Sequence, residues 1–346
     1  SEGCSLGKNK QHSDIQFDKT AVEKVYGKHH HMGLTSQELG ISYSHLKTLM
    51  AKYSIQAIIP WRSKGENDLL ESITSLNPNI EWISNDKSII NPYEIDILSK
   101  SNKLAVEYCG LYWHSETFGS KSKTYHQEKY QMCKDKGYNL ITVFESDDQK
   151  KILNLIKTKI GLTTRIYARK CEIYQIDSSI ASDFHKIHHL HKSVGGNTHY
   201  GLYYGDELIM VLSMGKPRFS SNYEWECTRM TSHSDYSVIG GASKLFAYFF
   251  KTHKVKSCVT FSDLRFGEGN VYGHCGLRFI KNTKPNYWYF HKDKPTELYS
   301  RVKFQKHKLK KLLPIFDESK TEYENMVMNK WDRIWDCGNS MWEYRA

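Results

Sequence analysis

Four acidic and imidazole side chains are of the types that hold a hard metal cation and move a proton. Asp96 and Glu107 lie in two consecutive stretches that alternate like strands. A hairpin would set these carboxylates side by side, and with the backbone carbonyl of Tyr108 they would form the oxygen site that Mg²⁺ prefers. Such a cation polarises a phosphate and activates a water, and His114 could take the proton from that water. Glu66, on a preceding helix, could complete the ligand shell.

The elements that must position these residues form an α/β unit. We expect a helix opening at Ser63–Glu66, strands at 93–98 and 103–108, a helix from about 122 to 136 before Gly137, and a buried strand at 139–144. The alternative is that Asp96 and Glu107 are surface ion-pair residues and that Trp113 and His114 only pack.

The run Gly110-Leu111-Tyr112-Trp113-His114 resembles the Gly-x-aromatic-Trp-His run of the very-short-patch repair (Vsr) endonucleases. With Asp96 and Glu66 it is similar to the core of the PD-(D/E)XK nuclease superfamily, and the longer pattern is similar to large phage-encoded homing-type endonucleases. The resemblance implies that Asp96 is a metal ligand, that His114 is the general base and that Glu66 is the helix acid. Trp113 either wedges into the base stack or belongs to the core or a lid.

One position, residue 109, departs from the family pattern in two respects. Position 109, commonly Asn or Asp in the phage proteins, is Cys109, and no Lys stands two residues after Glu107. The departure favours a mechanism centred on His114, with His126 or Lys129 helping to bind the scissile phosphate.

Residues 34–55 predict a helix-turn-helix unit. Thr35 and Glu38 have the spacing of a capping box, and Ser42 can cap the second helix. The exposed face of that helix would carry DNA-contacting residues, namely Tyr43, Ser44, His45 and Lys47. A plain helical packing unit is the alternative. The neighbouring His29–His31 triplet is either a metal cluster or a solvated stretch.

From residue 163 onward the order of strands and helices resembles the GNAT acyltransferase fold. Gly240-Gly241-Ala242 precedes an expected helix and resembles the pyrophosphate-binding turn of that fold, where backbone N–H groups suit an anion. The anion would be the pyrophosphate of an acyl-CoA or a DNA phosphate. The fuller signature is incomplete, because Asp235 or Tyr236 stands at the position of a basic or amide residue. We therefore favour binding or scaffolding over acyl transfer.

Two further groups of residues carry charge or metal-binding capacity. His185, His188 and His189 recur at helical spacing and either bind a transition metal or form a polar helix face. The segment 301–311 has six basic residues and no acidic residue. It favours phosphate contacts from Arg301, Lys303 and Lys306, against a merely solvated face.

Composition limits the class of protein. The net charge is +11, from 49 basic and 38 acidic residues, which favours a polyanionic partner. The eight cysteines include no C-x-x-C pair, so we expect reduced, buried thiols and no zinc ribbon. No apolar run reaches the length of a membrane span, and no membrane partner is expected.

The sequence therefore predicts a multidomain α+β protein. Its parts would be a helix-turn-helix region at 1–62, a Vsr-like α/β nuclease core at 63–162, and a GNAT-like α/β domain with a basic, aromatic tail at 163–346. The leading hypothesis is an endodeoxyribonuclease that uses Mg²⁺, or Mn²⁺ as a substitute, on double-stranded DNA in the cytoplasm of a phage-infected bacterium. The alternatives are a GNAT-type acyltransferase acting on nucleic acid or protein and a non-catalytic DNA-binding regulator.

Overall fold

The computed structural model describes residues 17–29, 32–55, 63–191, 195–219 and 221–346. The chain divides into two compact units, Ser1–Lys64 and Gly65–Ala346. His30, His31 and Cys4 lie outside the described residues, so the predictions made on them have no structural counterpart here. Within the described part of the chain, no helix is both long enough and apolar enough to cross a membrane.

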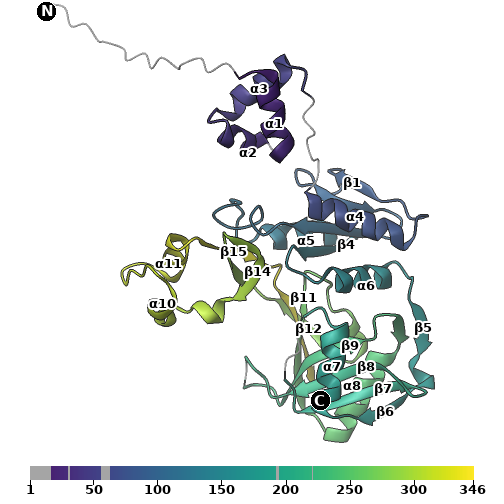
Figure 1. The fold of residues 1–346 in the computed structure, drawn as a ribbon. Helices are drawn as coiled ribbons and strands as arrows, with labels where there is room; N and C mark the ends of the chain where they lie inside the picture. Colours follow the sequence, from purple (N-terminus) through teal and green to yellow (C-terminus); the bar gives the residue numbers. More distant parts are fainter. Residues whose placement is uncertain (1–16, 30–31, 56–62, 192–194, 220) are drawn as a thin grey trace, which may run out of the picture. The chain divides into compact units, whose positions relative to one another are not determined.

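The described residues of the first unit form the helices (Figure 1) α1 (Lys19–His29), α2 (Met32–Glu38) and α3 (Tyr43–Lys52). Ser42 caps α3 as predicted, because its side chain accepts a hydrogen bond from the His45 backbone N–H at 3.2 Å. Thr35 is not an N-cap. It lies inside α2, where its side chain is fully buried and its carbonyl accepts the helical hydrogen bond from Leu39 N at 2.9 Å.

The second unit is a mixed α+β structure whose first part is a four-stranded sheet, ordered β1-β2-β3-β4. The first three strands pair antiparallel, and β3 and β4 pair parallel. The strands are β1 (Ile83–Asp86), β2 (Ile95–Ser99), β3 (Leu104–Cys109) and β4 (Asn139–Phe144).

Helices cover both faces of this sheet (Figure 1). On one face α4 (Lys64–Leu76) and α6 (Gln149–Lys159) pack against Ile97 and Val106. On the other face α5 (Tyr125–Asp135) packs against Leu98 and Ala105. Gly137 follows α5 with φ +76°, a left-handed conformation that glycine adopts without a steric cost.

A seven-stranded sheet forms the largest part of the second unit, ordered β12-β16-β11-β9-β8-β7-β6. Among its described strands, β9 and β11 are the parallel neighbours, and the other pairs are antiparallel. The strands are β6 (Glu172–Gln175), β7 (Thr198–Tyr204), β8 (Glu207–Gly215), β9 (Trp225–Ser232), β11 (Ser257–Asp263), β12 (Arg278–Asn282) and β16 (Asn339–Arg345).

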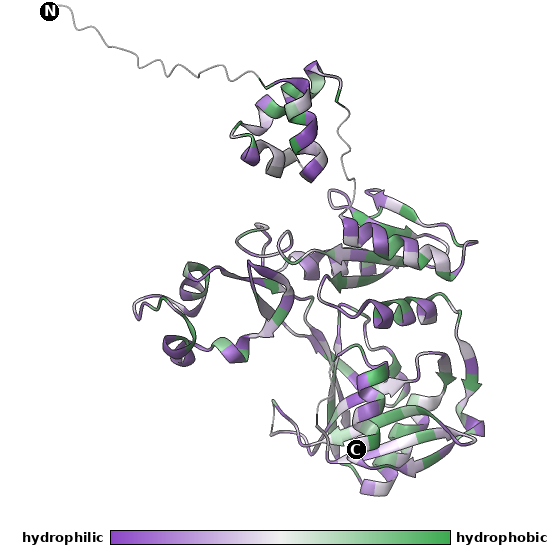
Figure 2. Ribbon diagram, viewed as in Figure 1, coloured by the Kyte–Doolittle hydropathy of each residue, from purple (hydrophilic) through white to green (hydrophobic). Residues whose placement is uncertain are grey.

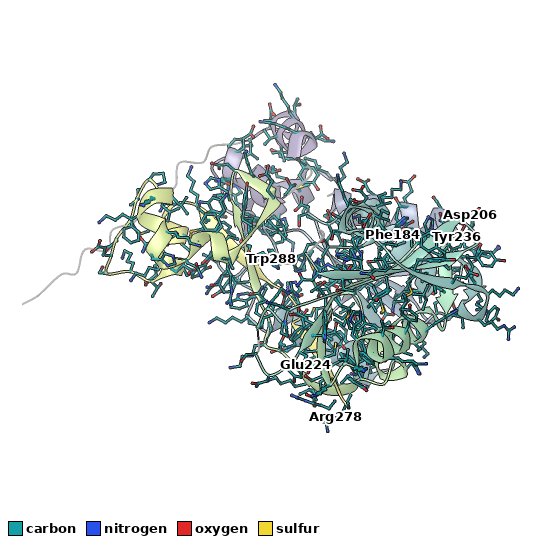
Figure 3. The ribbon with its side chains drawn as sticks, turned by 90° about the horizontal axis from the view of Figure 1, so that it is seen from below. Phe184, Asp206, Glu224, Tyr236, Arg278 and Trp288 are labelled. Atoms are coloured by element: carbon teal, nitrogen blue, oxygen red, sulfur yellow. The ribbon has the colours of Figure 1, made fainter. Side chains whose placement is uncertain are left out.

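These strands are rich in apolar residues (Figure 2), and helices pack their own apolar side chains against them. Helix α8 (Gly241–His253) inserts Phe246 and Phe249 into the main core, together with α9 (Val271–His274). Helix α7 (Ser178–His188) packs through Phe184, labelled in Figure 3, against Val211 of β8.

Residues 164–175 form two short strands that belong to different sheets. Strand β5 (Thr164–Tyr167) pairs in parallel with β10 (Tyr236–Ile239), whereas β6 pairs with β7 of the large sheet. Because the two halves belong to different sheets, the chain must turn between them, and it does so in a short 3₁₀ helix, η1 (Ala168–Lys170).

The aromatic C-terminal segment is not a tail. Strand β15 (Trp331–Trp335) joins β13 (Tyr287–His291) and β14 (Lys294–Ser300) in a three-stranded sheet, whereas β16 lies within the seven-stranded sheet. The intervening basic segment forms a 3₁₀ helix, η2 (Arg301–Phe304), and α10 (Lys306–Leu312), followed by α11 (Glu322–Met328). Trp288 of β13 (Figure 3) packs into a core cluster with Cys109 and Phe144 of the four-stranded sheet. The three-stranded sheet therefore shares a core with the four-stranded sheet.

Candidate functional site

Asp96 and Glu107 lie on the same face of the four-stranded sheet. The antiparallel register pairs Ile97 with Val106, so the next opposed pair along β2 and β3 is Asp96 and Glu107. Directly opposed residues point their side chains to the same face. Because Ile97 and Val106 face α4 and α6, the two carboxylates face α5.

Lys129 of α5 reaches across this face to Glu107. Its Nζ bonds Glu107 Oε1 and donates to the Glu94 carbonyl at 2.7 Å, and both members of the ion pair are 2% exposed. Burial opposes the charge on Lys129, but Glu107 outweighs it, so the pKa of Lys129 is raised. The pair is therefore a buried one, which excludes the reading of Glu107 as a surface ion-pair residue.

The two carboxylates differ in how far their hydrogen-bonding capacity is met. Asp96 Oδ2 accepts from the Tyr108 backbone N–H at 2.7 Å. Burial, followed by the nearby Glu107 charge, raises the pKa of Asp96 well above its ordinary value. Burial also raises the pKa of Glu107, against the lowering by Lys129. Glu107 Oε2 has no hydrogen-bond partner among the residues that the structure describes.

Glu66 and Tyr108 lie at the edge of this arrangement. Glu66 stands in the first turn of α4, is 8% exposed, and adds negative charge that further raises the pKa of Asp96. A Cβ at Gly65 would collide with the Tyr108 ring, so the start of α4 approaches β3 only because residue 65 is glycine. We call Glu66, Asp96, Glu107 and Lys129 the carboxylate–lysine cluster.

The two histidines predicted from the nuclease resemblance lie next to each other. His126 Nε2 is 3.2 Å from His114 Nδ1 and 3.4 Å from Cys109 Sγ, and His126 Nδ1 is 2.7 Å from the Trp335 carbonyl. Burial lowers the pKa of His126 to about 3 and, together with His126, lowers that of His114 well below its ordinary value. Both rings are therefore neutral at pH 7.

The loop that carries His114 is fixed by strand β15. Asp332 accepts hydrogen bonds from the backbone N–H groups of Thr117 and Phe118 at 2.9 and 2.8 Å. Arg333 Nε donates to Glu116 at 2.6 Å, as does the indole N–H of Trp335. Sequence reasoning missed this role, because more than 200 residues separate the partners. The Asp-Arg pair between two tryptophans in β15 was the available signal.

The residues predicted to contact DNA are exposed. On α3 these are Tyr43, Ser44, His45 and Lys47, and on the basic segment they are Arg301, Lys303 and Lys306. Trp113 is 56% exposed and packs edge-to-face on Tyr112, so it is not a core residue.

The histidine-rich helix does not form a metal site. His185 bonds Thr231 through Nδ1 and Ser213 through Nε2, each at 2.7 Å, whereas His188 turns to Ser234. His189 Nδ1 accepts from His191 N instead. The three rings therefore diverge, and they satisfy polar groups of the seven-stranded sheet and its loops.

Gly240 is the N-cap of α8 and Gly241 its first residue, and the turn is covered in part, since Gly240 is exposed whereas Gly241 and Ala242 are buried. Gly240 has φ +76°, and the Ala168 side chain lies 3.9 Å from the position of its missing Cβ. From the first turns of α8, Lys244 Nζ donates to the carbonyls of Ala168 and Cys171 at 2.9 and 2.5 Å. The segment around η1 thus packs directly against the residues that begin α8. We call residues 238–242 the Gly240 turn.

Comparisons with known proteins found no matching family model and no matching curated protein. One solved structure that matches is a GNAT family acetyltransferase from Elizabethkingia anophelis with acetyl-CoA bound. It has 12% identity and a TM-score of 0.29, and the match covers 51% of this chain and 99% of that chain. Another is a Bacillus subtilis acetyltransferase in complex with CoA, with 13% identity, a TM-score of 0.28, and coverage of 51% and 98%.

These matches correct one expectation. The chain was expected to be an endodeoxyribonuclease, a phosphodiester hydrolase, but both solved structures named above are acetyltransferases. The endodeoxyribonuclease assignment is therefore withdrawn. The observed arrangement of the candidate site does not depend on that assignment. Its residues are Glu66, Asp96, Glu107, His114, His126 and Lys129.

Proposed function

We propose that the protein binds double-stranded DNA and holds a divalent cation, Mg²⁺ or Mn²⁺, at the carboxylate–lysine cluster. The observation that carries the proposal is the buried Glu107 Oε2, which has no hydrogen-bond partner among the described residues and lies on the same sheet face as Asp96. A buried carboxylate oxygen without a partner is costly, and a cation offsets that cost.

The residues present fit a hard cation. Asp96 and Glu107 would supply carboxylate oxygens, the Tyr108 carbonyl would add a backbone oxygen, and Glu66 would complete the shell directly or through water. Lys129 already neutralises part of the negative charge of the cluster, so the cation has to neutralise only the remainder. When bound, the cation would supply positive charge for a phosphate oxygen of the partner.

Charge and exposure support DNA as the partner. The chain carries a net charge of +11. Helix α3 is the second helix of the predicted helix-turn-helix unit, the helix that this motif places in the major groove, and its predicted DNA-contacting residues are exposed. In the second unit, the exposed cations of η2 and α10 and the exposed Trp113 offer phosphate and stacking contacts.

The test measures cation and DNA binding separately on the full chain. Mn²⁺ binding is followed by electron paramagnetic resonance, and DNA binding by fluorescence anisotropy with and without Mn²⁺. Glu107→Gln should weaken Mn²⁺ binding at least about tenfold, because it removes a charged oxygen ligand. Glu128→Gln, an exposed residue of α5, is the control and should bind as the wild type does. Equal Mn²⁺ affinity in Glu107→Gln and the wild type would contradict the cation site.

Acyl transfer of the GNAT type is the second candidate function. It is favoured by the parallel pairing of β9 and β11, which covers only Trp225–Cys227 and Cys258–Thr260. Past those residues β9 and β11 no longer pair with each other. The contacts of Ala168 and Lys244 across the Gly240 turn weigh against it. Saturable acetyl-CoA binding, measured by calorimetry, is its test.

A further inference from the structure

We propose that Cys109, His114 and His126 bind a transition-metal cation of the Zn²⁺ type, at a site distinct from the carboxylate–lysine cluster. Cys109 comes from β3, His114 from the loop that follows it, and His126 from α5. The proposal concerns a second cation and does not depend on the proposed function.

The spacing of the three ligand atoms fits a tetrahedral cation. One atom from each residue, Cys109 Sγ and two imidazole nitrogens, lies within 4.8 Å of the others. Two nitrogens on tetrahedral Zn²⁺ lie about 3.3 Å apart, and a nitrogen and a thiolate sulfur about 3.6 Å apart, given the usual bond lengths. The observed separations are 3.2 Å between the imidazole nitrogens and 3.4 Å from Cys109 Sγ to His126 Nε2. They leave room for a shared cation after small shifts.

The second nitrogen of His126 is already committed to a backbone carbonyl. Its Nδ1 lies 2.7 Å from the Trp335 carbonyl, which accepts but cannot donate, so Nδ1 carries the proton and Nε2 carries a lone pair. A metal-bound histidine commonly donates its other N–H to a carbonyl in this way, which fixes the ring and its tautomer. That lone pair points to both Cys109 and His114.

Hydrogen bonds alone cannot pair Cys109 and His114 with His126 at the same time. His126 Nε2 has one lone pair, yet a thiol and an imidazole both approach it. The near-parallel rings of His114 and His126, 16° apart, further restrict how either ring could turn away. A cation would engage all three groups at once.

The ligand types select the cation. A thiolate with two imidazoles suits Zn²⁺ and similar metals rather than Mg²⁺. Cys109 is fully buried, and burial raises its pKa, so the thiol keeps its proton until a cation displaces it. Glu107 and Asp96 lie close enough to act on the Cys109 charge and would favour the added positive charge, whereas Lys129 opposes it. Three protein ligands leave a fourth position, and His114, the one of the three residues that is not fully buried, lies on the side nearest to solvent.

The test uses the full chain freed of metal by a chelator and then titrated with Co²⁺ and Zn²⁺. We expect one equivalent of Co²⁺ to give the visible bands of tetrahedral Co²⁺ and a sulfur-to-cobalt charge-transfer band, and Zn²⁺ to displace it. Cys109→Ser should abolish the charge-transfer band, and His114→Ala should weaken Zn²⁺ binding at least about 100-fold, since it removes a direct ligand.

Two variants separate this site from its neighbours. Cys133→Ser changes another fully buried thiol, on α5, and should keep the charge-transfer band. Glu107→Gln should keep the band at saturation and need more Co²⁺ to reach it, because Glu107 favours the added positive charge, whereas Cys109→Ser loses the band at every Co²⁺ concentration. Circular dichroism establishes that each variant is folded, and the partly exposed His114 provides a test less disruptive to the core. A folded wild type that shows no charge-transfer band, or a Cys109→Ser protein that keeps it, would overturn the proposal.

Discussion

The carboxylate–lysine cluster and the Gly240 turn are two predicted ligand sites that the structure treats in opposite ways. At the cluster, Glu107 Oε2 is buried and has no hydrogen-bond partner within the described residues. At the Gly240 turn, Ala168 and the segment held by Lys244 lie against the residues that would face a ligand. The first keeps a buried oxygen without a partner, whereas the second is packed in part against the chain itself and leaves Ile239 and Gly240 exposed.

The difference shows that a sequence motif does not determine whether its residues bind a ligand or only pack. A glycine before a helix and a carboxylate on a strand are both compatible with a ligand, but each can also serve packing. Burial and hydrogen-bond partners separate the two uses, because an unsatisfied buried oxygen costs free energy whereas a glycine against a neighbouring side chain is simply close-packed. The following predictions test that distinction.

The largest expected effect is the loss of Lys129. Lys129→Met leaves Glu107 buried without its counter-ion, and breaking a buried pair in this way costs about 3–5 kcal/mol of the free energy of unfolding. Urea unfolding in EDTA measures it. Lys134→Met, on the same helix with a partly exposed ion pair to Glu268, is the control and should cost less than about 1 kcal/mol. Equal costs for both variants would mean that the cluster is not the buried charge centre described above.

Gly241→Ala should be the next largest. Its Cβ would lie 2.6 Å from Val238 Cγ1 and 2.9 Å from Met210 Sδ, and such overpacking costs about 1–3 kcal/mol. The control is Gly273→Ala in α9, where the nearest atom is 3.5 Å away and little change is expected. If Gly241→Ala is as stable as the wild type, the glycine is not required by packing, and a ligand becomes the better explanation for it.

The sequence predicted the central elements of the four-stranded sheet because their residues carry local signals. Leu69 and Ile73 have helical spacing, and β2 and β3 alternate around Ile97 and Val106. Strand β1 and helix α6 were missed. Strand β12 was also missed.

The candidate site was predictable only where its residues are close in sequence. Asp96 and Glu107 follow from hairpin register, but the Lys129 ion pair was expected to be a phosphate contact. Its true partner depends on how α5 packs. The same holds for Trp335, whose carbonyl orients His126 from 209 positions away. Cys109 was noted only as a departure from the family pattern. Its alternation with Glu107 on β3 was the signal that both face the same side.

Asp96→Asn should have effects of opposite sign with and without a cation. The pKa of Asp96 is raised in the folded protein, so its ionised form opposes folding above that pKa, and the penalty disappears as pH falls below the unfolded value. In EDTA at pH 7.5 the variant should therefore melt at a higher temperature than the wild type, and the gap should close near pH 4. With Mn²⁺ the wild type should gain stability and the variant should not. A variant less stable than the wild type in EDTA would contradict this sign.

A smaller effect is expected from Lys303→Gln on DNA binding. One lost phosphate contact lowers the steepness of log K against log salt by about 0.9. Lys251→Gln on α8 also removes one exposed charge, and it should leave the slope unchanged. Anisotropy titrations from low to moderate salt measure both. Identical slopes for the two variants would assign the basic segment to a solvated surface.

The smallest expected effect concerns acetyl-CoA. Because the segment from Ala168 to Cys171 packs against the start of α8, we expect acetyl-CoA and inorganic pyrophosphate to leave the melting temperature of the wild type unchanged, while Mn²⁺ raises it. Lys244→Met releases the two carbonyl contacts, and it tests whether the covering segment is what excludes the ligand. If the variant binds acetyl-CoA and the wild type does not, the turn is competent but covered. If the wild type itself shows a saturable shift, the covering segment must move aside on binding. Acyl transfer would then rank above cation-dependent DNA binding as the function of the second unit.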